Sequence, residues 1–279
     1  MANEEQQQAW AAQGIDWVDN AAIFEAVLAP FADAVMHAAD ISSGQRVLDI
    51  GCGSGRLLQR AAAAGAVPFG VDISEPMAQA ARRRAPEATV ALGDAQTMDL
   101  RQAAAGASFD RVISRFGVMF FDDPVAAFIN VRRAAAPGSR LAFVCWRDGD
   151  NPMFTAGVDV LAAKLESPPA APDPAAPGPL AFGNAERVRA VLTGASWTDV
   201  AVEPFDGVCN FGIDGSDGVE ERLALLLANR TGQQARAELE TRGWAGVVEE
   251  LRAELRRQRV DGVVQFPGRT WVVTANNPS

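Results

Sequence analysis

The chain alternates short, continuous apolar runs with longer segments in which apolar residues recur at helical spacing. Short apolar runs bounded by glycine, proline or aspartate are typical of buried strands, whereas the helical repeat is typical of amphipathic helices. We therefore predict strands at 46–50, 67–72, 88–93, 109–114, 139–146, 198–206 and 268–275. Helices are predicted at 21–39 (with a break at Pro30), 54–64, 75–84, 123–136 and 184–194. This alternation indicates an α/β fold with a doubly wound, mostly parallel sheet.

The loop after the first predicted strand is rich in glycine. It reads Asp49-x-Gly51-x-Gly53-x-Gly55, and residues without a β-carbon let the backbone adopt positive φ angles and lie against a ligand. A dinucleotide-binding loop would place its third glycine at Arg56, so that pattern fails here. The second predicted strand ends on an acid, whose carboxylate can accept hydrogen bonds from hydroxyl groups. The sequence therefore predicts a nucleotide-cofactor site at the carboxyl edge of the sheet.

The acid and three glycines, with Asp72 at the end of the second strand, resemble the motifs of class I S-adenosylmethionine (SAM) dependent methyltransferases. The resemblance covers residues 43–146 strongly and the last strands weakly. It implies a Rossmann-like seven-stranded sheet whose last strand is antiparallel, with helical insertions as a cap. It also implies SAM as the cofactor, S-adenosylhomocysteine (SAH) as its product, and the Asp72 carboxylate on the ribose hydroxyls.

Further cofactor contacts are implied by the same resemblance. Asp94, after the third strand, is expected at the adenine amino group with the Ala95 amide beside it, and Met77 is expected against the ring. A turn-capping role for Asp94 and an ordinary core position for Met77 stay open. The cofactor-binding residues that the resemblance implies in these motifs are Asp49, Gly51, Gly53, Gly55, Asp72, Ile73, Met77, Asp94 and Ala95.

A second stretch, at 109–124, resembles a bacterial subgroup akin to the ubiquinone/menaquinone C-methyltransferases. Arg115 stands where the fourth strand meets the cofactor, and a guanidinium there can pair with the methionine carboxylate or with an anionic substrate. Phe116 and Phe120 are expected in the substrate site, because aromatic faces stabilise a nearby positive charge. Apolar residues of this loop also suit the core, and periodicity alone does not separate the two roles.

Three segments are extra to the predicted sheet. Because the strands at 139–146 and 198–206 run parallel to the first strand, the segments that follow them begin at the cofactor edge and are expected to wall the substrate pocket. The Pro-rich run in the first of them fits either a lid or an exposed polyproline linker. In the second, helices are expected at about 216–229 and 233–259. The expected segments are an N-terminal helical lid at 1–40, a SAM-binding core at 41–146, a Pro-rich insertion at 147–183, a core helix and strand at 184–206, a helical cap at 207–266 and a final strand at 267–279.

Trp10 and Trp17 are seven residues apart and share one face if 5–18 is helical. The resemblance implies an N-terminal helix bearing tryptophan that covers the site, so both are expected to bind substrate beneath a lid. A simple hydrophobic dock for an N-terminal arm is the alternative.

General bases are scarce, since the chain has no tyrosine and only one histidine, His37. His37 lies on an apolar-rich helix and is not expected to be catalytic, and Cys52 in the glycine loop has no base beside it. Methyl transfer is an in-line displacement that proximity and orientation accelerate strongly. We expect either an acceptor that is reactive as bound, such as an electron-rich carbon, an amine or a carboxylate, or a carboxylate base from the insertions.

Net charge limits the partners. At −10, with a pI near 4.7, the chain lacks the basic face that nucleic acids require. Three scattered cysteines show no metal-ligand spacing, no apolar run reaches the length of a membrane span, and the N-terminus lacks a signal pattern. We expect a reduced, cytoplasmic, bacterial protein without a metal, whose oligomeric state stays open because the amphipathic 247–260 segment could pack on its own core or on a partner.

The expected function is methyl transfer from SAM to a small, largely apolar molecule, either a quinone precursor or a secondary metabolite. A SAM-binding protein that does not methylate is the alternative, and a NAD-linked oxidoreductase is a weaker one.

Overall fold

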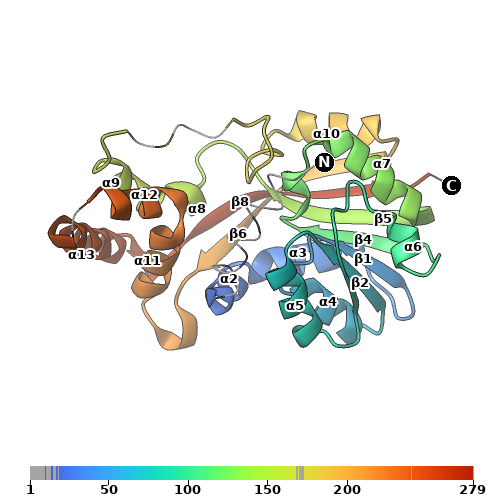
Figure 1. Ribbon diagram of the computed structural model, residues 1–279, viewed down its shortest axis with the longest axis horizontal. Coiled ribbons are helices and arrows are strands. Elements are labelled where there is room, and N and C mark those ends of the chain that lie inside the picture. Colours follow the sequence, from blue (N-terminus) through green and yellow to red (C-terminus); the bar gives the residue numbers. More distant parts are fainter. Residues whose placement is uncertain are drawn as a thin grey trace.

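The computed structural model describes residues 10, 14, 17, 19–167, 169, 173–239 and 241–278 (Figure 1). The sheet has the strand order β3-β2-β1-β4-β5-β8-β6, with a short β7 paired to β8. Strands β1 to β5 pair in parallel, and β8 is antiparallel to both β5 and β6. The predicted Rossmann-like α/β fold with an antiparallel last strand is thus confirmed. The strands are β1 Arg46–Ile50, β2 Val67–Asp72, β3 Thr89–Leu92, β4 Phe109–Arg115, β5 Ala135–Trp146, β6 Thr198–Asn210, β7 Arg259–Val260 and β8 Val263–Asn276.

Helices cover both faces of the sheet (Figure 1). One layer holds α3 Ala29–Ala39, α4 Arg56–Ala63 and α5 Glu75–Arg84, and the other holds α7 Pro124–Ala134 and α10 Ala185–Gly194. Both helices of the second layer begin at a side-chain cap: Asp123 accepts a hydrogen bond from the Ala126 amide (2.9 Å), and Asn184 accepts one from the Arg187 amide (3.0 Å). The strands between these layers are covered on both faces, which is why their sequences are continuous apolar runs.

The N-terminal helical segment divides as predicted around Pro30. Helix α2 Ala21–Val27 ends at Leu28, and α3 then starts in a new direction with Pro30 in its first turn, where the missing amide costs no helical hydrogen bond. No single helix in the described part of the chain is long and apolar enough to cross a membrane; α2 and α3 reach that length and composition only as a pair bent by 59°.

Strands β6 and β8 extend beyond the predicted ends of 206 and 268. They stay paired out to Asn210 and Gln265, well past the last pairing of β5, which joins Trp146 to Thr270. Pro267 is tolerated inside β8 because β8 pairs there with β6 alone. The result is a two-stranded ribbon that projects from the core and carries a helical cap, seen on the left in Figure 1.

The cap consists of α11 Val219–Ala228, α12 Arg230–Glu238 and α13 Thr241–Arg257. The helix predicted at 233–259 is wrong as a single element, because α12 begins at Arg230 and α13 is a separate helix. The Asn229 side chain starts α12 by accepting a hydrogen bond from the Gly232 amide (2.9 Å). Helix α13 packs on α11 and on α9 Val158–Ala162, within this chain's own cap. The 147–183 segment contributes α9 and α8 Pro152–Thr155, and α6 Leu100–Ala103, a single turn, was not predicted.

Candidate active site

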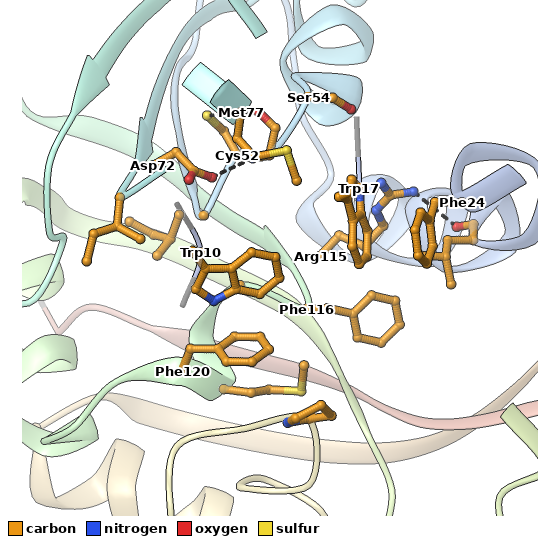
Figure 2. A pocket seen from close by; sticks show the side chains of 18 of the residues that line it. Trp10, Trp17, Phe24, Cys52, Ser54, Asp72, Met77, Arg115, Phe116 and Phe120 are labelled. Carbon is orange, nitrogen blue, oxygen red and sulfur yellow. Dashed lines mark hydrogen bonds between the residues drawn. The ribbon is translucent and has the colours of Figure 1, made fainter. Parts of the chain in front are cut away.

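A cavity of about 850 Å³ opens at the carboxyl ends of β1, β2 and β4, where the fold predicts a ligand. Figure 2 shows the side chains that point into it: those of the glycine loop and Asp72 lie at one end, and the aromatic side chains face them. The N-terminal segment, the 147–183 insertion and the cap each contribute to its wall. All three segments that the sequence analysis expected to cover or wall the site contribute residues to this cavity.

The glycine loop is closely packed against the loop after β4. Gly51 has a φ of 63°, and a β-carbon there would lie 2.8 Å from the Gly117 Cα atom. The Ser114 hydroxyl ties the two loops, because it donates to the Ile50 carbonyl (2.7 Å) and accepts from the Gly117 amide (3.1 Å). On the helix side, a β-carbon on Gly55 would lie 2.9 Å from the Ala81 Cα atom. These glycines are therefore required by close backbone approach as well as by the loop conformation.

Asp72, at the end of β2, closes the glycine loop. Its Oδ2 accepts a hydrogen bond from the Gly53 amide (2.8 Å) and its Oδ1 accepts one from the Ser74 amide (2.9 Å). Burial raises the pKa of Asp72, and these backbone hydrogen bonds oppose the rise. Each carboxylate oxygen retains a lone pair, so Asp72 can hold the loop and still accept from two hydroxyl groups in the cavity.

Asp49 and Arg115 form the charged floor of the cavity. Asp49 is 1% exposed, and neither of its carboxylate oxygens has a hydrogen-bond partner among the residues that the structure describes. Burial raises its pKa strongly; the nearby Arg115 opposes this and Asp72 reinforces it. Burial likewise lowers the pKa of Arg115 to about 10, while Asp49 counteracts it. An unpartnered buried carboxylate is costly, so this floor is built to receive a cationic ligand group.

Of the remaining predicted cofactor residues, Ile73, Met77, Asp94 and Ala95 border the cavity, whereas Gly55 does not. Ile73 and Met77 follow Asp72 on the loop and first turn of α5, and Gly93, Asp94 and Ala95 follow β3. Asp94 also caps its own turn, as its Oδ1 accepts from the Gln96 amide at 2.8 Å. Turn capping and cavity lining are therefore compatible at this residue.

Aromatic rings form the wall opposite the glycine loop (Figure 2). Trp10 meets Phe120 edge to face, with ring centroids 5.1 Å apart, and Trp17 stacks on Phe24 at 3.8 Å. Trp10 and Trp17 thus border the cavity, although most of the predicted 5–18 helix is outside the described residues. The aromatic and methionine side chains that border the cavity are Trp10, Trp17, Phe24, Met77, Phe116, Met119, Phe120, Phe121, Trp146, Met153 and Phe154.

Phe116 has an uncommon backbone for a non-glycine residue, with a φ of 65°. Its ring stacks on Trp146 at 4.2 Å and meets Phe31 edge to face at 5.4 Å. Strained backbone of this kind persists where packing holds it, often at a functional site. Here it directs an aromatic ring into the cavity wall.

The insertions supply wall residues that sequence reasoning did not name. Phe154 comes from α8, residues 177–179 come from the Pro-rich run, and Arg230 comes from α12. The Gly178 amide donates to the Met119 carbonyl (3.0 Å), which holds residues 177–179 against the loop after β4. The sequence indicated the location of this wall only through topology, because both insertions follow strands that end at the cofactor edge of the sheet.

His37 and Cys52 differ in their position relative to the cavity. His37 is exposed on α3 and does not border the cavity. Cys52 borders it but is buried, and burial raises the pKa of its thiol well above the usual range. Within the described residues no cluster of three or more histidine, cysteine or acidic side chains could hold a metal ion.

Residues 48–143 match the methyltransferase domain family, and the strand order of the sheet agrees with that match. This match confirms the resemblance stated from the sequence, and one matched protein carries a name from the expected subgroup. It is 28% identical over 181 residues to demethylmenaquinone methyltransferase of Paenarthrobacter aurescens, which covers 62% of this chain and 70% of that protein.

Other relatives extend the comparison. The chain is 34% identical over 128 residues to an uncharacterized protein of Mycobacterium tuberculosis, covering 46% of this chain and 47% of that one. It therefore spans about half the length of several curated relatives that it matches. Among solved structures, phosphoethanolamine N-methyltransferase 2 of Haemonchus contortus, bound to phosphomonomethylethanolamine and SAH, matches with a TM-score of 0.52. It is 18% identical and covers 92% of this chain and 56% of that one.

Proposed function

We propose that the protein transfers a methyl group from SAM to a small, largely apolar molecule bound in the aromatic part of the cavity. The observation that carries this proposal is the continuity of the cavity. One space joins the glycine loop and Asp72 to a wall of aromatic rings. When bound, SAM supplies an activated sulfonium methyl group, so the protein must mainly hold the two partners in line.

The chemistry of the floor fits SAM. The cofactor's ammonium group would face Asp49, whose two oxygens lack described partners, and its carboxylate would face Arg115. Asp72 would accept from the ribose hydroxyls, and Asp94 and Met77 would contact the adenine. A NAD-linked reaction is disfavoured, because Arg56 occupies the position of the third dinucleotide glycine and begins α4.

The acceptor must be reactive as bound. Among the described residues that border the cavity, the acids are Asp49, Asp72 and Asp94, all from the core; no described wall residue from the insertions is an acid. Of the two alternatives left open by the sequence, a reactive acceptor is therefore favoured over a carboxylate base from the insertions. A quinone precursor or a secondary metabolite with an electron-rich ring satisfies this condition, and the demethylmenaquinone methyltransferase relative supports the first.

We also propose that the tryptophan-bearing N-terminal segment acts as a lid and that the protein works in the bacterial cytoplasm. The stacking of Trp17 on Phe24 at the cavity supports the lid. The three cysteines are all free and buried, which fits a reducing compartment. The net charge of −10 supports a small-molecule acceptor over a nucleic acid.

A product assay tests methyl transfer and separates it from cofactor binding without methylation. Purified protein is incubated with SAM and a panel of electron-rich aromatic acceptors, and both SAH and methylated product are quantified. We expect SAH to form in step with acceptor consumption. Tight SAM binding with no SAH formed across the panel would instead favour a SAM-binding protein that does not methylate. The lack of a base among the described residues of the acceptor wall is consistent with that alternative.

A further inference from the structure

We propose that the acceptor carries a carboxylate and that Arg230 recognises it, an inference that rests on the proposed methyl transfer. The cavity has two parts with different charge. Its core part holds Asp49, Asp72, Asp94, Arg56 and Arg115. The acceptor part is formed by α8, the Pro-rich run, the loop after β4 and the junction of α11 with α12. Arg230 is the one charged side chain that the described residues place in that acceptor wall.

Arg230 is available to a ligand. It makes no ion pair or side-chain hydrogen bond with any residue that the structure describes, although arginines elsewhere on the cap, such as Arg252 with Glu220, are paired. The neighbouring polar wall residues are engaged within the helix: the Asn229 side chain caps α12, and the Gln233 side chain donates to the Ala228 carbonyl (3.0 Å). Arg230 is therefore the charged side chain of this wall that no described residue engages.

A single guanidinium selects a particular kind of anion. Its planar fork matches one carboxylate through two parallel hydrogen bonds, whereas a phosphate dianion is usually held by several donors together. Most of the other residues of the acceptor wall are apolar, including Phe154 from α8 and Leu225 from α11. An apolar or aromatic body with one carboxylate at the cap end complements both features.

The test compares a carboxylate with its neutral isostere on the cofactor-loaded protein. SAH-saturated protein is titrated with 2-naphthoate and with 2-naphthamide, and binding is followed by calorimetry and by the fluorescence of the tryptophans at the cavity. We expect the wild type to prefer the carboxylate by about tenfold, the factor that one charge-assisted contact at an exposed position supplies. The preference should shrink as salt screens the exposed guanidinium.

The decisive variant is Arg230→Gln, and Arg236→Gln is its matched control. Arg236 lies on the same helix, is exposed, and does not border the cavity, so its loss changes the net charge equally. Arg230→Gln should abolish the preference while leaving the affinities for 2-naphthamide and SAH unchanged, and Arg236→Gln should retain it. A preference that survives in Arg230→Gln, or failure of both probes to bind the SAH-loaded wild type, overturns the inference. Failure of SAH itself to bind would instead overturn the proposed function.

Discussion

The two parts of the cavity differ in how the chain builds them. The cofactor part comes from the ends of adjacent parallel strands, with Asp49 and Asp72 at the ends of β1 and β2, which pair directly. The acceptor part is assembled from segments far apart in sequence, such as α8 and α12, brought together by the β6–β8 ribbon. The cofactor part is polar and fixed by local backbone geometry, whereas the acceptor part is mostly apolar and fixed by packing. Substitutions in each part should therefore affect different ligands.

The largest effect is expected for Asp72→Ala. This change removes the acceptor for two ribose hydroxyls and the partner of the Gly53 and Ser74 amides. We expect SAM affinity to fall about 100- to 1,000-fold, since each hydrogen bond to a charged group contributes roughly 1.5–3 kcal/mol. Calorimetry measures this loss, and Asp33→Ala, which removes only a surface ion pair with Arg60, is the control. Comparable loss in both variants would contradict a direct role for Asp72.

Asp49→Asn should weaken SAM binding by about 10- to 100-fold, because the cofactor's ammonium loses a charged partner. It should also stabilise the unliganded protein. Burial raises the pKa of Asp49 above 3.8, so the folded state holds this proton more tightly than the unfolded chain does. The stability that the protonated carboxyl contributes is fully present below pH 3.8 and is lost as the pH rises through the raised pKa.

Thermal unfolding as a function of pH checks this expectation. The Asn variant should melt a few degrees higher than wild type at neutral pH, and the difference should vanish at acidic pH, where Asp49 is protonated. A lower melting temperature for the variant at neutral pH would mean that Asp49 is stabilised by its surroundings in the unliganded protein.

Phe154→Ala should act on the acceptor alone. The ring meets Trp146 edge to face at 5.3 Å and borders the cavity from α8. Its loss should raise KM for an apolar acceptor about tenfold, the effect of removing one well-packed ring, while the dissociation constant of SAM stays at the wild-type value. If the SAM affinity fell by the same factor, the two parts would not be separable.

Trp17→Ala tests the lid, which touches both parts. Loss of the stacked pair with Phe24 should reduce SAM affinity and turnover by about fivefold each, in the range expected of an aromatic pair at a partly open site. Steady-state kinetics and SAM titration measure the two effects. A variant with wild-type values for both would leave the N-terminal segment as a hydrophobic dock only.

His37→Ala should have the smallest effect. The side chain is exposed on α3 and does not border the cavity. The free energy of unfolding should therefore stay within about 0.5 kcal/mol of wild type, and turnover and its pH dependence should be unchanged. A sharp drop in rate with SAM binding intact would show that a base reaches the acceptor from outside the described cavity wall.

Local motifs made the cofactor part predictable. The residues from Asp49 to Gly55 and the acid at Asp72 lie in strand ends and tight turns, where a few neighbouring residues determine the backbone. The acceptor part was predictable only as a location. Nothing near Phe154 or Arg230 in the sequence indicates that they share a wall, because their proximity depends on a ribbon whose length exceeds the prediction. Likewise, the break before α13 was missed because the apolar repeat continues across it.

The most direct test of the central claim is calorimetric titration of the wild-type protein with SAM, SAH and NAD. The charged floor of Asp49 and Arg115 and the carboxylate of Asp72 fit a sulfonium amino acid joined to a nucleoside. We predict micromolar binding of SAM and SAH, each with one site per chain, and no measurable binding of NAD. Binding of NAD without SAM or SAH would contradict the assignment of this cavity to methyl transfer.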